Sequence, residues 1–370
     1  MAVRVLHIIG QIAVGGAEIQ LLGLCRRIDK GRFPMAVCYY DPNPDNMVEE
    51  FAASGVELHY VDKPNLSAWG LIGQLRGVIR SFEPDVIHTW QYSPNFWGRL
   101  AAWTCGCKRL VAAERTSRVL RSRAMRCLEK LVGRRTIWLV NSHAVADAVR
   151  QVVRVPTERI RVIHNAVELP PRDRSADRAE VRSELGLLAD QPIVLSVGRL
   201  TEAKNYPMLF RAARIVLSRR PDVRFLIAGQ GEDEGKLRAL HEQLGLGEFV
   251  RLLGLRRDVP RLLSAADAFC LSSLWEGFPN CLLEAMAAGL PVVSAAFPGV
   301  EEFFLPDRTG LMVNVDDHES LAAAILRLLD DRDLASGCGR AAQEWVQGRF
   351  SWPKLVANME ALYNDCMKGR

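Results

Sequence analysis

Short apolar runs alternate with amphipathic stretches along nearly the whole chain. Continuous apolar and β-branched runs are typical of buried parallel strands, whereas apolar positions three or four residues apart indicate helices. The predicted strands are 3–9, 35–40, 86–89, 110–113 and 137–140, then 193–197, 224–228, 250–253, 268–271 and 291–295. Helices are predicted between them, for example over 206–218, 235–244 and 320–329. This alternation predicts an α/β fold with two doubly wound parallel sheets.

A polar, proline-containing stretch without periodicity, residues 168–177, separates the two series of strands. Such a composition favours a linker. We therefore expect a Rossmann-like first domain over 1–168 and a second Rossmann-like domain over 169–351. Residues 352–370 predict one further helix after the second domain.

Composition excludes several protein classes. The 370 residues are 49% hydrophobic and 25% charged, the balance of a globular protein rather than a disordered or fibrous one. No apolar run approaches the ~20 residues that span a bilayer, and the N-terminus is typical of a strand rather than a signal peptide. Nine cysteines, an odd number, favour a reducing compartment. Cys105 and Cys107 form a close pair but lack a second pair at zinc spacing.

Charge is distributed unevenly. Residues 1–168 carry a net charge of +8 and the remainder −3, and eight basic residues against one acid, Glu129, lie between Arg115 and Arg135. Residues 119–131 resemble a basic amphipathic helix. An anionic membrane surface or a pyrophosphate-linked lipid would suit this 115–135 segment, and a merely solvated surface is the alternative. No nucleic-acid-binding module is present, so we expect no nucleic-acid partner.

Gly15 and Gly16 follow the first predicted strand and open a helix. Glycines there let the backbone approach an anion closely, although a tight turn without a ligand is the alternative. The spacing is not G-x-G-x-x-G. Asp41, at the end of the second strand, lies where a dinucleotide ribose could bind, so a nicotinamide enzyme is a further alternative.

The second series of strands offers two cations for phosphate. Strand 193–197 leads into a loop that carries Arg199 and Lys204, and a helix follows. Charge-assisted hydrogen bonds from such groups contribute about 1.5–3 kcal/mol each, so this pair predicts a phosphate site.

Two glutamates follow strand 268–271. Glu276 lies in the loop and Glu284 is expected in the first turn of the next helix, where it could instead be a capping acid. The amides of Asn280, Cys281 and Leu282 would face an anion at this helix start. The spacing of the two glutamates is a weak signal by itself.

Taken together, these motifs resemble the retaining glycosyltransferases of family 4, which have the GT-B fold. The resemblance covers essentially the whole chain and rests on the loops 15–18 and 198–204, the segments 84–88 and 162–165, and the run 276–293. It implies a nucleoside-diphosphate sugar, UDP- or GDP-linked, in the second domain and the acceptor in the first. It also implies that the last helix, 352–370, crosses back onto the first domain. No cofactor or metal is implied, because the nucleotide sugar is a co-substrate.

The resemblance implies a role for each matching residue. Arg199 and Lys204 would hold the diphosphate, Glu284 the ribose and Glu276 the transferred sugar. Other residues would contact the donor through their backbone or lie near its base: Gly15, Gly16, Arg256, Phe278, Pro279, Asn280, Cys281 and Leu282.

His88 aligns with an active-site histidine of that family, and a core residue is its alternative. Trp90 stands where the family commonly has a second histidine. Trp90, Tyr92, Phe96 and Trp97 form an aromatic cluster that suits a sugar or lipid acceptor or simply a core.

Asp331 and Asp333 match a metal motif of another glycosyltransferase fold, but they follow a predicted helix, so we interpret them as a solvated helix end. Glu232, Asp233 and Glu234 are interpreted as a helix start.

The sequence thus predicts a retaining transferase that moves a sugar to a cell-envelope glycan or lipid-linked acceptor. We expect it in the cytoplasm, peripheral on the inner face of the membrane. A nucleotide-sugar epimerase of GT-B architecture and a non-catalytic sugar-nucleotide-binding module are the alternatives.

Overall fold

The computed structural model describes residues 2–40, 46–118, 122–168 and 175–368. The chain forms two compact units. Unit 1 consists of Met1–Ala166 and Trp352–Arg370, and unit 2 is Val167–Ser351. The chain therefore leaves unit 1, builds unit 2 and returns to unit 1 for its last helix.

Unit 1 is built on a parallel sheet whose described strands number seven, in the order β3-β2-β1-β4-β5-β6-β7. The strands are β1 Val5–Ile9, β2 Met35–Tyr39, β3 Glu57–Tyr60, β4 Val86–Trp90, β5 Leu110–Glu114, β6 Thr136–Val140 and β7 Ile160–Val162. The strand order reverses between β1 and β4, which pair directly, His7 opposite His88. Ligands of open α/β sheets bind beyond the carboxyl ends of the strands at such a reversal.

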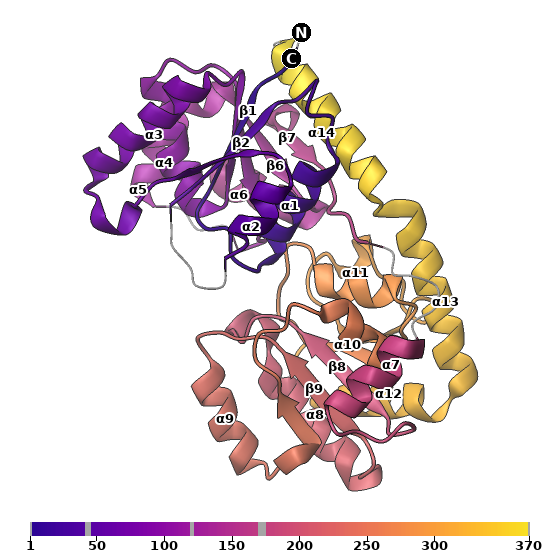
Figure 1. Ribbon diagram of the computed structural model, residues 1–370. Helices are drawn as coiled ribbons and strands as arrows, with labels where there is room; N and C mark the ends of the chain where they lie inside the picture. The colour runs from indigo at the N-terminus through magenta and orange to yellow at the C-terminus, as the bar shows by residue number, and fades with distance from the viewer. Residues whose placement is uncertain (1, 41–45, 119–121, 169–174, 369–370) are drawn as a thin grey trace. The chain divides into compact units, whose positions relative to one another are not determined.

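Helices cover both faces of this sheet. They are α1 Gly16–Arg27, α2 Val48–Ala53, α3 Ala68–Phe82, α4 Tyr92–Thr104, α5 Arg123–Val132, α6 His143–Val153 and α14 Trp352–Met367. Figure 1 shows α3, α4 and α5 together on one face, while α1 and α14 lie on the other. Because both faces are covered, β1, β4, β5 and β6 are buried along their whole length.

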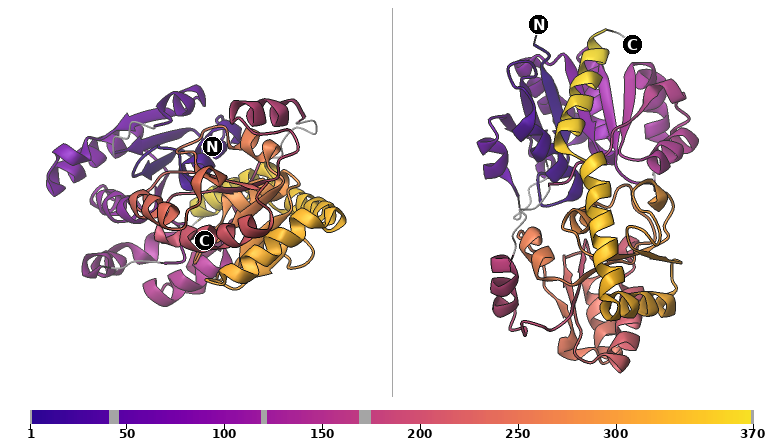
Figure 2. Two further views of the ribbon diagram at one scale, coloured as in Figure 1. Left: turned by 90° about the horizontal axis from the view of Figure 1, so that it is seen from below. Right: turned by 90° about the vertical axis from the view of Figure 1, so that its right-hand side faces the viewer.

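The C-terminal helix α14 completes the core of unit 1. Leu355, Met359 and Tyr363, spaced four residues apart, are buried on one side of the helix, as an amphipathic pattern requires. Helix α14 packs on α1, where a Cβ atom at Gly23 would lie 1.9 Å from the Trp352 ring. The right-hand view of Figure 2 shows α14 along the strands of unit 1.

Unit 2 has a second parallel sheet, whose described strands number six, in the order β10-β9-β8-β11-β12-β13. They are β8 Ile193–Val197, β9 Arg224–Ala228, β10 Val250–Leu252, β11 Ala268–Leu271, β12 Val292–Ala295 and β13 Leu311–Val313. The helices are α7 Ser175–Glu184, α8 Tyr206–Arg219, α9 Glu234–Gln243, α10 Val259–Ala265, α11 Asn280–Ala287, α12 His318–Asp330 and α13 Arg332–Arg349. Here the strand order reverses between β8 and β11.

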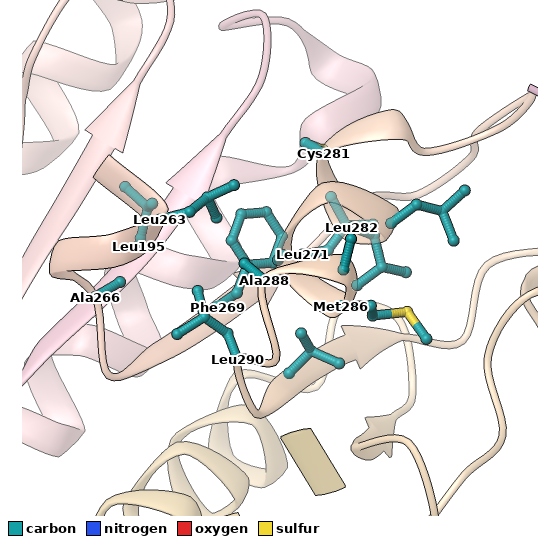
Figure 3. Packing of buried hydrophobic residues seen from close by; sticks show 14 of the residues in the cluster. Leu195, Leu263, Ala266, Phe269, Leu271, Cys281, Leu282, Met286, Ala288 and Leu290 are labelled. Atoms are coloured by element: carbon teal, nitrogen blue, oxygen red, sulfur yellow. The ribbon is translucent and has the colours of Figure 1, made fainter. Parts of the chain in front are cut away.

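Helix α11 is anchored in the core of unit 2. Its Leu282 and Met286 lie among Phe269, Leu271 and neighbouring apolar side chains, and Cys281 lies at the edge of this cluster (Figure 3). Burial of such side chains is worth about 1.5–3 kcal/mol each, which fixes the start of α11 relative to the strand ends.

The predicted fold class is confirmed: two doubly wound parallel sheets are present. Strands β3, β7 and β13 were not predicted. Helix α7 begins at Ser175, inside the stretch predicted as a linker, and residues 169–174 lie outside the described part of the chain. None of the described helices is both long and apolar enough to span a bilayer.

Candidate functional site

The loops that carry Lys204 and Glu276 leave adjacent strands of unit 2. Lys204 ends a short 3-10 helix after β8, and Glu276 lies in the loop between β11 and α11. Strands β8 and β11 pair directly at the reversal of strand order. The topology thus brings these two predicted residues together at the edge of the sheet where ligands are expected.

Lys204 and Glu276 form an ion pair. Lys204 Nζ donates to Glu276 Oε1 at 2.6 Å, and the two side chains are only 15% and 14% exposed. Burial alone would lower the pKa of Lys204, but the neighbouring Cys281 and Glu276 groups outweigh it and hold that pKa above its usual value. Lys204 is therefore a fixed cation.

Neighbouring groups hold this pair from both sides. Ser273 Oγ donates to the same Glu276 oxygen at 2.7 Å, and Ser272 Oγ donates to the carbonyl of Lys204 at 2.8 Å. Cys281 Sγ lies 3.8 Å from the Lys204 ammonium, and burial raises the pKa of this thiol to about 11. Sequence reasoning missed Ser273, although a serine three residues before a loop glutamate was available as a signal.

Two glycines make room for the Lys204 side chain. A Cβ atom at Gly198 would lie 2.6 Å from Lys204 Cε, and one at Gly229 would lie 1.9 Å from the Gly198 carbonyl oxygen. Gly229 also has a φ of +154°, which side chains rarely tolerate. The loops after β8 and β9 therefore touch through their backbones beside the ion pair.

Glu284 lies in the second turn of α11, which starts at Asn280, so the prediction that it occupies the first turn was wrong. Burial raises the pKa of its carboxyl to about 7, and Lys204 offsets this only in part. Among the described residues its carboxyl has no hydrogen-bond partner.

The predicted anion site at the amides of this helix start needs a correction too. The Asn280 amide donates to the carbonyl of Phe278, and that of Leu282 donates to Pro279. Both amides are thus engaged in the turn itself. The Phe278 side chain packs against Phe303 and Phe350.

The two arginines predicted to bind the donor in unit 2, Arg199 and Arg256, differ in their ion pairs. Arg199 is exposed beyond β8 and makes no ion pair with any residue in the described ranges. Arg256 is held by Asp258, with both of its hydrogen bonds at 2.7 Å, and by Glu184 at 3.2 Å. A base could stack near Arg256, but its guanidinium already has carboxylate partners.

In unit 1, Gly15 and Gly16 lie at the start of α1, beyond the carboxyl end of β1. A Cβ atom at Gly15 would lie 2.4 Å from a carboxylate oxygen of Glu18, which is buried. Gln91, after β4, donates to Glu18 at 3.2 Å and has a φ of +69°, a strained conformation for glutamine. Sequence reasoning missed Glu18 and Gln91 as a pair at the reversal point.

His88 is not at a strand end, as predicted, but inside β4, with no exposed surface. Its Nδ1 is 3.0 Å from the Tyr363 hydroxyl of α14, and its ring stacks on Trp90 at 4.7 Å. Burial, then His7 and Arg115, lowers the pKa of His88 well below its usual value. In this structure His88 is a core residue that contacts α14, so direct contact with a sugar is unsupported.

Arg115 does not belong to the exposed basic surface predicted for 115–135. It donates to Asn165 and lies 4.5 Å from the Trp90 ring, and burial lowers its pKa to about 10. Trp90 is buried too, whereas Tyr92 is exposed. The predicted aromatic cluster is thus split between core and surface.

The acidic motifs lie at helix starts: this agrees with the interpretation of residues 232–234, whereas Asp331, interpreted as a helix end, follows α12 and also caps α13. Asp331 Oδ1 accepts from the amide of Leu334 at the start of α13, and Asp233 is the N-cap residue of α9. Asp41, which motivated the nicotinamide alternative, lies outside the described residues.

Comparisons with known proteins identify glycosyltransferases as relatives of this chain. The family described as Glycosyltransferase Family 4 matches residues 14–169, and the family Glycosyl transferases group 1 matches residues 177–345. The UDP-Gal:alpha-D-GlcNAc-diphosphoundecaprenol alpha-1,3-galactosyltransferase of Escherichia coli is 29% identical over 76% of this chain and 75% of its own. The lipopolysaccharide core biosynthesis glycosyltransferase LpsE of Rhizobium meliloti is 35% identical over 46% of this chain and 49% of its own.

Solved structures share the fold. Anabaena Alr3699/HepE in complex with UDP-glucose superposes with a TM-score of 0.85 at 21% identity, over 98% of this chain and 99% of that one. Sucrose-phosphate synthase from Thermosynechococcus elongatus superposes with a TM-score of 0.78 at 20% identity, over 99% and 100%. Since the two family matches divide nearly the whole chain between them, the chain belongs to the glycosyltransferases of family 4, which have the GT-B fold.

Proposed function

We propose that this glycosyltransferase moves a sugar from a nucleoside-diphosphate sugar to a cell-envelope glycan or lipid-linked acceptor, with retention of anomeric configuration. The observation that carries the proposal is the buried contact of Lys204 with Glu276. It lies beyond the carboxyl ends of β8 and β11, between which the strand order reverses. It supports the proposal because Lys204 could bind phosphate and Glu276, beside it, could bind sugar hydroxyls. The relatives named above support the substrate classes, since one is named for UDP-Gal and a diphosphoundecaprenol acceptor.

The transfer breaks the bond between the anomeric carbon and a phosphate oxygen and forms a bond from that carbon to an acceptor oxygen on the same face. The acceptor hydroxyl loses its proton to the departing phosphate oxygen. Lys204 and Arg199 would stabilise the negative charge that develops on the diphosphate, the kind of effect that contributes most to catalysis. They supply the charge that a metal ion supplies elsewhere, so the proposal requires none.

Glu276 and Glu284 would orient the donor. Glu276 presents its carboxylate to hydroxyls of the transferred sugar, and Glu284, one helical turn into α11, would accept from the ribose. Positioning of this kind turns an encounter between two molecules into a reaction within one complex.

Thermal shift and turnover test the donor assignment. A ligand at about 100 times its Kd adds about 2.7 kcal/mol of stability, so UDP, GDP and ADP can be ranked by the rise in Tm. Lys204→Ala should lower turnover by about 10²–10³-fold, as is typical when a charge-stabilising donor is removed. Lys236→Ala, a fully exposed lysine on α9, is the control and should leave turnover unchanged. Full activity in Lys204→Ala would overturn the assignment.

We further propose that unit 1 docks on the inner face of an anionic membrane from the cytoplasm. Helix α5 begins at Arg123, and its acid Glu129 is turned inward to Arg99 at 2.6 Å. On the face that bears α3, α4 and α5, Trp69 is 83% and Leu131 53% exposed. The exposed cations of this segment are Arg118, Arg123, Arg126, Lys130, Arg134 and Arg135. Exposed aromatic rings and clustered cations are typical of interfacial membrane binding.

Vesicle co-sedimentation tests this surface. Replacing Arg123 and Arg126 by Glu should abolish binding to vesicles that contain anionic lipid, and added salt should weaken the binding of the unmodified protein. The matched control is the same double reversal at Lys236 and Arg238 on α9. Equal binding by both reversed variants, or binding indifferent to anionic lipid, would overturn the membrane proposal.

A further inference from the structure

One oxygen of Glu276 accepts hydrogen bonds from two donors. Oε1 accepts from Lys204 Nζ at 2.6 Å and from Ser273 Oγ at 2.7 Å. Ser273 has no exposed surface, so its hydroxyl is fixed in place. The cation proposed to bind the diphosphate is therefore already occupied by the carboxylate proposed to bind the sugar.

We propose that the Lys204–Glu276 ion pair is exchanged, not merely supplemented, when a donor binds. Lys204 transfers to the diphosphate, a sugar hydroxyl takes its place on Glu276, and Ser273 keeps its hydrogen bond to Glu276 throughout. This inference rests on the proposed function and assigns to the same site a means of distinguishing the intact donor from the spent nucleotide.

The intact donor and the free nucleoside diphosphate differ in whether they give the Glu276 carboxylate a new partner. A nucleoside diphosphate without sugar can draw Lys204 away, but it offers nothing to the Glu276 carboxylate. Leaving one partner of a desolvated charge pair without compensation is costly. The intact donor supplies a hydroxyl and avoids this cost.

The same exchange favours product release. Once the sugar has moved to the acceptor, Glu276 has lost its hydroxyl partner while the nucleotide still holds Lys204. Glu276 then competes for the ammonium and weakens the hold of the site on the product. Ser273 is a positioning residue in this cycle, because it acts through Glu276 and stabilises that carboxylate while Lys204 is away.

Calorimetric titration of the full chain with UDP, GDP and ADP, each alone, tests the exchange. The nucleotide whose binding Lys204→Ala weakens most serves for the comparison. Glu276→Gln should bind this nucleotide about tenfold more tightly than the unmodified protein, because Lys204 no longer has to leave a carboxylate. The gain should vanish in the Lys204→Ala background.

The matched control for charge is Glu202→Gln. Glu202 is exposed two residues before Lys204 and is not among its hydrogen-bond partners. Glu202→Gln removes one negative charge near Lys204 but does not release the Lys204 ammonium from Glu276. It should therefore change nucleotide affinity far less than Glu276→Gln does.

Ser273 gives a second, independent readout. Ser273→Ala should weaken nucleotide binding although Ser273 is not proposed to touch phosphate, and Ser273→Thr should restore it. The loss should disappear in the Glu276→Gln background, which a purely structural defect would not do. Ser264→Ala, a buried serine whose hydroxyl bonds the carbonyl of Arg261, is the control for removing a buried hydroxyl from unit 2.

The possible outcomes distinguish failure of the proposed exchange from failure of the proposed function. If a nucleotide binds in a Lys204-dependent manner and Glu276→Gln leaves its affinity unchanged or weaker, the exchange is wrong and the proposed function stands. If no nucleotide binds in a Lys204-dependent manner, both are overturned.

Discussion

At the scale of single residues, the charge of Glu284 depends on conditions near neutral pH. Its pKa is raised to about 7 by burial, so at neutral pH a large fraction of the carboxyl is protonated. In the proposed function Glu284 accepts hydrogen bonds from the ribose hydroxyls, and protonation weakens the carboxyl as an acceptor. Donor affinity should therefore fall by up to about tenfold per pH unit as the pH drops below 7, and level off above it.

Titration of UDP-glucose between pH 5.5 and 8.5 measures this dependence. Glu284→Gln should bind more weakly and lose the pH dependence that belongs to the protein. Titration of the ligand itself is common to both proteins and cancels in the comparison. An identical pH profile for both would assign the dependence to another group.

His7 and His88 should make the protein sensitive to acid. Burial lowers the pKa of His7 to about 3 and that of His88 well below its usual value, whereas both titrate near 6.5 in the unfolded chain. Each takes up a proton on unfolding, so the stability they contribute is present above pH 6.5 and is lost as the pH falls. The free energy of unfolding should drop by up to about 1.4 kcal/mol per histidine and pH unit.

Urea unfolding at pH 7 and 5.5, followed through unit 1, measures this loss. Glu284 in unit 2 has a raised pKa and acts in the opposite direction, which makes a signal specific to unit 1 necessary. His88→Gln should reduce the pH dependence, and His318→Gln, on the surface of unit 2, should not. A stability of unit 1 that is constant over this range would contradict the placement of both histidines.

At the scale of elements, the contact of α1 with α14 depends on one missing methyl group. A Cβ atom at Gly23 would lie 1.9 Å from the Trp352 ring, so Gly23→Ala should force the helices apart. Overpacking of this kind costs about 1–3 kcal/mol. Thermal unfolding should show a lower Tm.

The matched control lies on α3. Gly77 is exposed, and a Cβ atom there would have nothing within 4 Å. Gly77→Ala should therefore stabilise the protein by about 0.5–1 kcal/mol through helix propensity. Equal effects of the two substitutions would show that helix propensity rather than the Trp352 contact decides the outcome.

Element prediction succeeded where burial was complete. The central strands are apolar along their length because helices cover both faces, so sequence alone located β1, β4, β8 and β11. It missed β3 and β7, which are short and only partly buried and therefore lack a continuous apolar run. It also missed β13, which is apolar but only three residues long. In the site, the family resemblance implied that Lys204 and Glu276 bind the same donor, and the two side chains are in contact. The hydrogen bond from Ser273 to Glu276 depends on side-chain packing, which cannot be predicted from the spacing of residues in the sequence.

At the scale of the whole molecule, unit 1 is assembled from two distant stretches of chain. Deleting 352–370 removes Leu355, Met359 and Tyr363 from its core and uncovers the apolar side chains of α1 and the sheet. Unit 1 should then become sensitive to proteolysis. Unit 2, which is formed by one continuous stretch of chain, should stay resistant. Limited proteolysis should yield a resistant fragment of about residues 175–351.

The control is a shorter deletion, residues 368–370, which leaves all of α14 in place. It should behave as the full chain does. Equal resistance of both units after removal of 352–370 would mean that α14 contributes nothing essential to unit 1.

The return of the chain to unit 1 also sets an order of events during synthesis. The strands of unit 1 are synthesised before unit 2, yet the helix that closes their core is synthesised only after every residue of unit 2. Unit 2 can therefore complete its fold while unit 1 still lacks its final helix. Of the two units, unit 1 is thus begun first and completed second, and in a growing cell it is the unit with the longer need of protection by chaperones.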